Sequence, residues 1–171
     1  MKDFTNKIIC GDNIQVMKTL PDNCINLTVT SPPYDNLREY QGYTFDFEAV
    51  AQQLYRITKE GGVVVWVVGD ATVNGSETGT SFRQALFFME VGFNLHDTMI
   101  YGKTNFSAVG ALVTRYAPVF EYMFILSKNK IKTFNPIKDR KCKTVGSKKS
   151  GMIRQKNGEF KPMSNQGWIP S

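Results

Sequence analysis

Residues 25–34 read Ile-Asn-Leu-Thr-Val-Thr-Ser-Pro-Pro-Tyr, and this stretch decides how the chain folds. Its first half, Ile25 to Val29, has the length and the β-branched content of a buried strand. Pro32 and Pro33 have no backbone N–H to donate to a sheet, so the strand must end before them and continue into a loop. In open α/β sheets, ligands bind at such carboxyl ends of strands. The stretch therefore predicts a binding loop that carries a hydroxyl, two rigid rings and an aromatic side chain.

The residues before this strand indicate another strand, a loop and a short helix. Residues 8–10, Ile-Ile-Cys, predict a strand, and Gly11 and Asp12 follow it in a loop. Residues 13–20 carry apolar side chains at helical spacing and lead into a turn at 21–23. Asp12 stands where the N-cap of this helix is expected.

The region after the Pro-Pro loop continues the alternation of helices and strands. A helix is predicted within residues 45–62, where apolar side chains recur every three or four positions and Gly61 supplies a C-terminal stop. Residues 63–68 form a continuous apolar run, which is typical of a parallel strand buried on both faces. Residues 75–80 are interpreted as a loop.

The last predicted elements are a helix and two strands. The helix at 81–91 is expected to carry its apolar residues on one side, namely Phe82, Ala85, Leu86 and Met89. Strands are expected at 93–101 and 118–126, and they could pair antiparallel across a long polar loop. Loops of that length are usually functional or mobile.

The order Ser31, Pro32, Pro33, Tyr34 resembles the catalytic motif of the DNA amino-methyltransferases. These enzymes use S-adenosylmethionine to methylate the exocyclic amine of adenine or cytosine. The resemblance covers roughly residues 7–140 and implies a three-layer, Rossmann-like α/β methyltransferase sheet. It also implies catalytic roles for Ser31, Pro32, Pro33 and Tyr34, and contacts to S-adenosylmethionine from Gly11, Asp12 and Ser31.

The chemistry of the loop agrees with that resemblance. An exocyclic amine is a poor nucleophile because its lone pair is delocalised into the ring. The Ser31 hydroxyl oxygen and the Pro32 carbonyl could accept the amine hydrogens and restore the lone pair, with Pro33 fixing the loop. Tyr34 would stack on a base that has been flipped out of the duplex. Serine at the first motif position favours cytosine-N4 methylation, and adenine-N6 methylation is the alternative. Methylation at carbon 5 of cytosine is disfavoured because the chain has no Pro-Cys pair.

Charge divides the chain into two parts. The net charge is +6, yet residues 1–126 hold 9 Lys and Arg against 13 Asp and Glu, while residues 127–171 hold 12 against 2. The sequence therefore predicts a catalytic part at 1–127 and, from Lys128, a basic segment at 128–171 that begins a target recognition region. Double-stranded DNA is the expected partner of this segment. The residues favoured for DNA contact are Arg38, Lys138, Arg140, Lys141, Lys143, Lys148 and Lys149.

One part of the family pattern is missing. Methyltransferases of this kind need a loop of the form Phe-x-Gly-x-Gly where backbone approaches the cofactor closely, and the chain has no such segment. In the permuted order, with the Pro-Pro motif first, this loop lies beyond the target recognition region, so a C-terminally truncated methyltransferase is expected. Two alternatives stay open. One is an inactive DNA-binding remnant that needs a complementary fragment or a homo-oligomer, and the other is an unrelated α/β nucleotide-binding protein.

Composition bounds the remaining possibilities. The chain has 171 residues, enough for one domain with a true core, and no apolar run approaches the roughly 20 residues of a membrane span. It shows no signal peptide. Its three cysteines, Cys10, Cys24 and Cys142, lack the spacing of a metal site and are expected to be reduced thiols, two of them in core segments. A cytoplasmic protein without a metal ion or a membrane partner is predicted.

Overall fold

A computed structural model describes residues 4–33, 44–104, 114–137 and 151–162. It divides the chain into two units, Met1–Phe134 and Asn135–Ser171. The first unit extends past residue 127 because the chain still pairs with the sheet there. The Lys128 N–H donates to the Gly62 carbonyl over 3.1 Å, and the Gly61 N–H donates to the Lys128 carbonyl over 2.7 Å.

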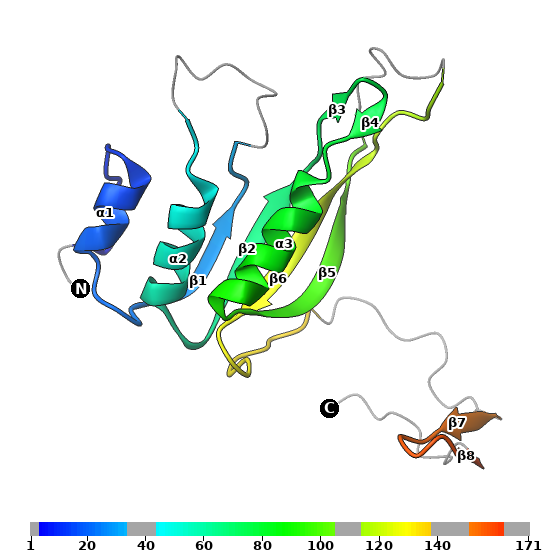
Figure 1. The fold of residues 1–171 in the computed structure, drawn as a ribbon. Helices are drawn as coiled ribbons and strands as arrows, with labels where there is room; N and C mark the ends of the chain where they lie inside the picture. The colour runs from blue at the N-terminus through cyan, green and yellow to red at the C-terminus, as the bar shows by residue number, and fades with distance from the viewer. Residues whose placement is uncertain (1–3, 34–43, 105–113, 138–150, 163–171) are drawn as a thin grey trace. The chain divides into compact units, whose positions relative to one another are not determined.

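The first unit is organised around a sheet of four strands, in the order β1-β2-β6-β5 (Figure 1). Their bounds are β1 Ile25–Thr30, β2 Thr58–Val68, β5 Asn94–Gly102 and β6 Phe120–Ser127. β1 and β2 run parallel, and β6 runs antiparallel to both β2 and β5. The strands predicted at 25–29 and 63–68 are confirmed. The antiparallel pair predicted for 93–101 and 118–126 is also confirmed, as β5 and β6.

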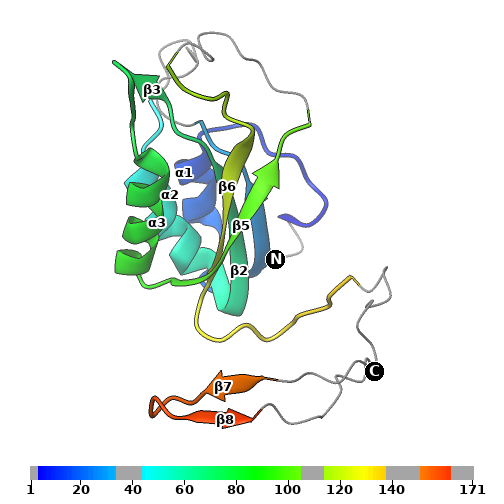
Figure 2. The ribbon, with the colours of Figure 1, turned by 90° about the vertical axis from the view of Figure 1, so that its right-hand side faces the viewer.

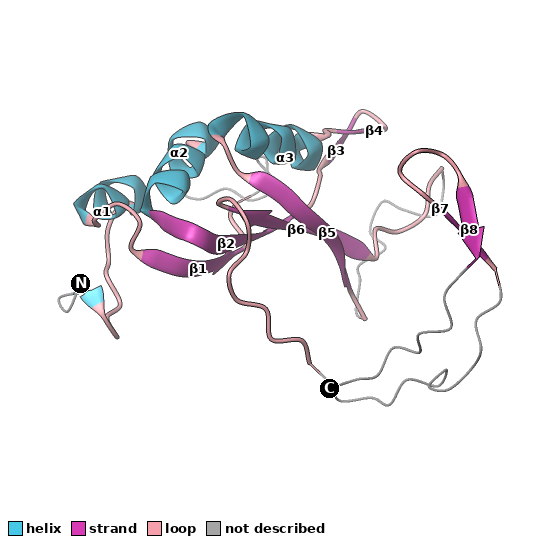
Figure 3. Ribbon diagram, turned by 90° about the horizontal axis from the view of Figure 1, so that it is seen from below, coloured by secondary structure: helices cyan, strands magenta, loops and turns pink. Residues whose placement is uncertain are grey.

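Within the described residues, three helices cover one face of this sheet. They are α1 Asn13–Thr19, α2 Phe47–Ile57 and α3 Thr80–Val91. Figures 2 and 3 show all three helices on the same side of the strands. The core lies between these two layers, where Val64, Trp66 and Val68 of β2 are buried together with Phe88 of α3. No helix in the described part of the chain is long and apolar enough to cross a membrane.

The opposite face of the sheet carries apolar side chains that no described helix covers. Leu27 and Val29 of β1 are 58% and 64% exposed, and their neighbours Val63 and Val65 on β2 are only partly buried. Alternate residues of a strand point to opposite faces, so these four side chains share one surface. The α/β fold is thus present with two of its three expected layers among the described residues. β2 is therefore buried on one face, which corrects the expectation of burial on both.

Residues 8–10 do not form the predicted strand. Ile8 is fully exposed and Ile9 is 46% exposed, because no described strand lies alongside to pair with this segment. A strand needs a hydrogen-bonded neighbour, and an apolar pattern alone does not supply one. Cys10 is accordingly exposed, whereas Cys24 is buried as expected; both are free thiols, and Cys142 lies outside the described residues.

The second helix ends earlier than Gly61, contrary to the sequence prediction. α2 stops at Ile57, and Thr58 is already extended, with φ −70° and ψ 132°. The Thr58 hydroxyl donates to the Leu54 carbonyl over 2.6 Å and so terminates the helix. Gly61 instead lies within β2 at φ +78°, a conformation that favours glycine.

The third helix also differs from its prediction in the face that it buries. Phe82, Leu86 and Met89 are about half exposed, while Ser81, Gln84, Ala85 and Phe88 are buried. The two buried polar side chains each have a partner. Gln84 accepts a hydrogen bond from Trp66, and Ser81 donates to Asp70. Because these bonds offset the cost of burial, the apolar stripe does not decide the orientation of the helix.

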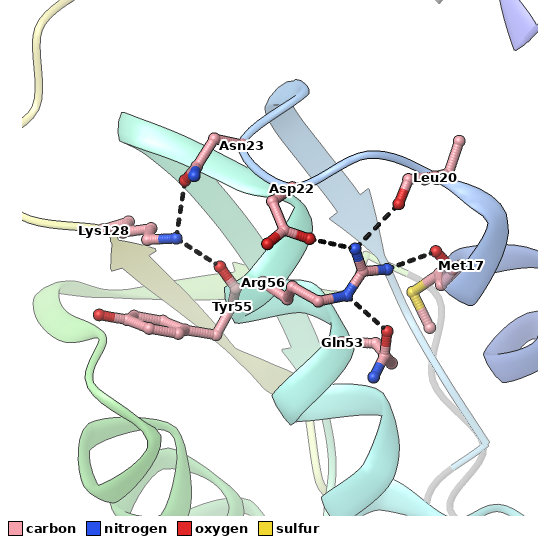
Figure 4. Close-up of polar contacts among 8 residues, drawn as sticks. All are labelled: Met17, Leu20, Asp22, Asn23, Gln53, Tyr55, Arg56 and Lys128. Atoms are coloured by element: carbon pink, nitrogen blue, oxygen red, sulfur yellow. Dashed lines mark hydrogen bonds and ion pairs between the residues drawn. The ribbon is translucent and has the colours of Figure 1, made fainter.

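Arg56 ties α1, α2 and the turn before β1 together at the amino end of β1 (Figure 4). Its guanidinium donates to the carbonyls of Met17 and Leu20 over 2.7 and 2.9 Å. It also pairs with the Asp22 carboxylate at 2.5 Å. The Arg side chain thereby adds a donor to the Met17 carbonyl, which also accepts from the Leu20 N–H over 3.0 Å, and supplies one to the Leu20 carbonyl just after α1.

Lys128 lies in the interior of the first unit and is 7% exposed. Its ammonium group donates to the Asn23 side chain over 2.9 Å and to the Tyr55 carbonyl over 2.8 Å, and it stands 4.4 Å from the centre of the Tyr55 ring (Figure 4). The sequence analysis assigned Lys128 to the basic segment that is expected to contact DNA. That interpretation is wrong for this residue, because its ammonium group is buried and contacts Asn23 and Tyr55.

The second unit contains a small antiparallel hairpin. Its strands are β7 Met152–Arg154 and β8 Phe160–Pro162. The Gln155 N–H donates to the Glu159 carbonyl over 2.7 Å, and Gly158 takes φ +86° in the turn. Arg154, Lys156 and Lys161 are exposed on this hairpin.

Candidate functional site

The Pro-Pro loop lies where the sequence places it, directly after β1. Thr30 pairs with Trp66 in the last register position of β1 and β2, and Ser31 follows. Ser31 is exposed, Pro32 is buried and Pro33 is partly buried. The buried Pro32 ring anchors the loop, and the Ser31 side chain remains accessible beside it.

A cavity of about 340 Å³ adjoins this loop. Its walls come from α1, β1, the Pro-Pro loop, α2 and β2. The lining residues are Asn13, Met17, Thr28, Thr30, Ser31, Pro32, Pro33, Phe45, Val50, Leu54 and Trp66. Such a mostly apolar cavity with a few polar groups is typical of a small-molecule site.

Trp66 and Phe45 form the aromatic wall of the cavity. Their rings are stacked, with centroids 6.4 Å apart and planes 27° from parallel. The Trp66 indole N–H donates to the Gln84 side-chain oxygen over 2.8 Å, which fixes the ring through α3. Trp66 was not among the predicted site residues. The signal was available, since a tryptophan that lies two residues before the end of a core strand is close to the carboxyl edge of the sheet.

Asp12 caps α1 and lies next to a cavity residue. Its carboxylate oxygen Oδ1 accepts from the Gln15 N–H over 2.9 Å. The following residue, Asn13, lines the cavity, whereas Gly11 and Asp12 do not. The structure therefore brings the start of α1 to the same end of the sheet as Ser31. Asp12 is exposed, and a carboxylate can accept more hydrogen bonds than the one that the cap uses.

Other predicted site residues lie outside the described part of the chain. These are Tyr34, Arg38, Lys138, Arg140, Lys141, Lys143, Lys148 and Lys149. Among the residues that are described, no group of three or more His, Cys, Asp or Glu side chains could hold a metal ion.

Comparison with known sequences gives a consistent set of relatives. The sequence model of a DNA methylase family, the N6/N4 methylases, matches residues 25–168. The orphan methyltransferase M.BamHII of Bacillus amyloliquefaciens is 60% identical over 144 residues, which are 83% of this chain and 54% of that protein. The type II methyltransferase M.BslI of Bacillus sp. (strain NEB-606) is 27% identical over 71% of this chain and 16% of its own length. The chain thus spans about half of M.BamHII and a smaller part of M.BslI.

Comparison with solved structures supports the fold. The PvuII DNA methyltransferase, a cytosine-N4-specific enzyme, superposes with a TM-score of 0.59 at 21% identity, over 71% of this chain and 48% of that one. The M1.HpyAVI complex with SAM superposes with a TM-score of 0.58 at 20% identity, over 80% and 60%. At these identities the likeness concerns the fold, and in both cases the matching region is a part of a larger protein.

Proposed function

Because the chain belongs to the N6/N4 family of DNA methylases, we propose that it carries the target-base half of a DNA methyltransferase active site. The observation that carries this proposal is the Ser31–Pro33 loop, which stands at the carboxyl end of β1 beside an aromatic-walled cavity. The proposed reaction is methylation of an exocyclic amine of a flipped base in double-stranded DNA. A cytoplasmic location is part of the proposal, since the substrate is DNA.

The residues of the loop would activate the amine by accepting its hydrogens. Ser31 is exposed and its hydroxyl can accept, while the Pro32 carbonyl belongs to a residue that burial holds in place. Two fixed acceptors draw the amine toward tetrahedral geometry and localise its lone pair on nitrogen. Pro33 restricts the loop, and Tyr34 would stack on the base. No covalent bond between enzyme and base is required.

S-adenosylmethionine is the proposed methyl donor, and it would supply an electrophilic methyl group on a sulfonium. The structure offers a partial fit for it. The exposed Asp12 carboxylate retains acceptor capacity for ribose or adenine donors, and it stands next to Asn13 at the cavity. Gly11 and Ser31 are the further proposed contacts. M1.HpyAVI, whose fold the chain shares, was solved as a complex with SAM, which supports the assignment of the donor.

Cytosine-N4 is the favoured target, with adenine-N6 as the alternative. Ser31 at the first motif position supports cytosine, and so does the cytosine-N4 specificity of the PvuII enzyme, whose fold the chain shares. Digestion of methylated DNA to nucleosides separates the two products, N4-methylcytosine and N6-methyladenine.

A complementary polypeptide is proposed as a partner that completes the site. The match covers 54% of M.BamHII, and the 171-residue chain has no Phe-x-Gly-x-Gly loop. The uncovered face of the sheet around Leu27 and Val29 supports this, since an apolar surface of this kind marks a contact with another segment. Without that partner, the second candidate function is DNA binding without methyl transfer. Homo-oligomerisation through the same face is the alternative.

Two measurements test the proposed function. Calorimetric titration with S-adenosylmethionine, with and without duplex DNA, asks whether the chain binds the donor alone. Transfer of a labelled methyl group to DNA is then measured for the chain mixed with the part of M.BamHII that lies outside the matched region. Methylation by the mixture and none by either half supports the proposal. A mixture that assembles and binds both ligands, yet methylates no amine, would contradict it.

A further inference from the structure

A second cavity, of about 510 Å³, lies at the carboxyl end of β2 beside the candidate site. β1 and β2 are parallel neighbours, so Ser31 and Gly69, which follow them, lie at the same carboxyl end of the two strands. Adjacent strands are about 4.8 Å apart. Ser31 and the part of this cavity at Gly69 thus follow neighbouring strands at the same end of the sheet. The nucleotide next to a base at Ser31 is therefore the part of the DNA that this cavity is placed to meet.

The charged groups of the second cavity are not equally available to a ligand. The Asp70 carboxylate accepts from the Ser81 N–H over 2.9 Å and from the Ser81 hydroxyl over 2.5 Å. Glu121 pairs with the Lys103 ammonium at 2.5 Å. Arg115 instead donates to the hydroxyl of Thr72, a neutral partner, and its side chain is exposed. The remaining acidic lining residue, Glu77, is exposed and lies opposite Thr72 in a short antiparallel pair, where water and salt screen its charge. Arg115 is thus the cationic lining residue whose described side-chain partner is a neutral hydroxyl.

The hydroxyl that holds Arg115 belongs to a short hairpin. Its strands are β3 Thr72–Val73 and β4 Ser76–Glu77, joined by Asn74 and Gly75 at positive φ. The sequence prediction of a loop at 75–80 missed the Asn-Gly pair, which is a strong hairpin signal. The Thr78 N–H donates to the Ala71 carbonyl over 2.9 Å and closes the base of the hairpin. Arg115 is therefore held in place before any ligand arrives, which lowers the entropic cost of binding.

Tyr116 adds an aromatic surface next to this cation. It lines the same cavity and is 92% exposed. An aromatic ring beside an arginine can stack on a base while the cation contacts the phosphate. Flipping the target base unstacks one face of the neighbouring base and leaves that face open to such a ring.

We propose that the second cavity is a subsite for the nucleotide that flanks the target base, with Arg115 on its phosphate and Tyr116 against its base. This inference rests on the proposed function, because it requires a DNA strand whose target base lies at Ser31. It assigns the β3–β4 hairpin a role in positioning Arg115 through Thr72.

Fluorescence anisotropy with a 20-base-pair duplex that carries one central mismatched cytosine tests the subsite. Flipping a mismatched base requires less free energy than flipping a paired one, so this probe favours the strand conformation, with one base flipped out, that the subsite would bind. Arg115→Gln should lower the slope of log affinity against log salt by about 0.9, and Arg115→Lys should retain the slope. Tyr116→Ala should weaken binding on the order of 10-fold.

Arg83→Gln is the matched control. Arg83 is also exposed in the first unit and also donates to a threonine hydroxyl, that of Thr80, but it does not line the second cavity. Replacing Arg83 should leave the salt slope of DNA binding unchanged. It should lower the DNA affinity only by the small amount expected when one distant charge is removed. If Arg115→Gln behaves as Arg83→Gln does while the parent chain binds DNA, the subsite is wrong and the proposed function stands. If the parent chain does not bind the duplex alone, the variants are compared in its mixture with the remaining part of M.BamHII. If that mixture does not bind the duplex either, both are overturned.

Discussion

The hydrogen bond between Trp66 and Gln84 should contribute measurably to folding, and Gln84→Met tests this. Trp66 is 1% exposed and Gln84 is 6% exposed, and the indole N–H donates to the amide oxygen over 2.8 Å. Methionine has a similar length but is at most a weak acceptor, so the buried N–H loses its partner. Leaving a buried donor unsatisfied costs about 1–3 kcal/mol. That is a large share of the ~5–15 kcal/mol by which domains are usually stable.

Urea unfolding followed by far-UV circular dichroism measures this loss. With a urea dependence of about 2 kcal/mol per molar, a loss of ~2 kcal/mol lowers the unfolding midpoint by roughly 1 M. Gln52→Met is the control, because Gln52 is exposed on α2 and the same replacement there should change stability by less than about 0.5 kcal/mol. Equal midpoints for the two variants would refute the reasoning. A double variant that also carries Trp66→Phe should lose less than the sum of the single changes, since the N–H is then absent.

Three further outcomes are expected. In the mixture with the remaining part of M.BamHII, Ser31→Ala should lower the methyl-transfer rate roughly 100-fold with little change in DNA affinity, as comparison of turnover with anisotropy would show. A parental rate would remove Ser31 from the mechanism. Gly92→Ala should lower the free energy of unfolding by ~1–3 kcal/mol, measured with urea, because Gly92 has φ +120° and an added Cβ would stand 2.9 Å from the Tyr55 ring. Gly75→Ala should lower it less, since Gly75 has φ +80° but no atom within 4 Å of an added Cβ. Leu27→Lys should reduce self-association of the chain in sedimentation velocity, since it places a charge on the uncovered face; unchanged association would locate the contact elsewhere.

Local signals predicted the elements whose form depends on neighbouring residues alone. The run from Ile25 to Val29 becomes β1 because it is apolar, β-branched and closed by two prolines. Asp12 caps α1 as its position before the helix indicates. The loop at Ser31–Pro33 was placed correctly for the same reason, since the end of a strand fixes where the loop begins.

Features that depend on tertiary contacts could not be predicted from the sequence. Ser81 and Gln84 are buried because Asp70 and Trp66 stand opposite them, and no pattern within α3 contains that information. Lys128 was counted as a surface cation, although Asn23 and Tyr55, both distant in sequence, provide acceptors for it in the interior. Polar residues with distant partners are therefore where apolar periodicity misleads.

The short helix α1 links the structural anchor of the first unit to its candidate site. It has seven residues, and a helix of that length is not stable by itself in water. Arg56 holds its C-terminal end through the carbonyls of Met17 and Leu20, while Asn13 at its other end lines the cavity beside Ser31. At 1.5 Å per residue, the helix is about 10 Å long, which is the distance between these two ends. Arg56 thus contacts the end of α1 that lies away from Ser31, and the opposite end of the same helix supplies Asn13 to the cavity wall.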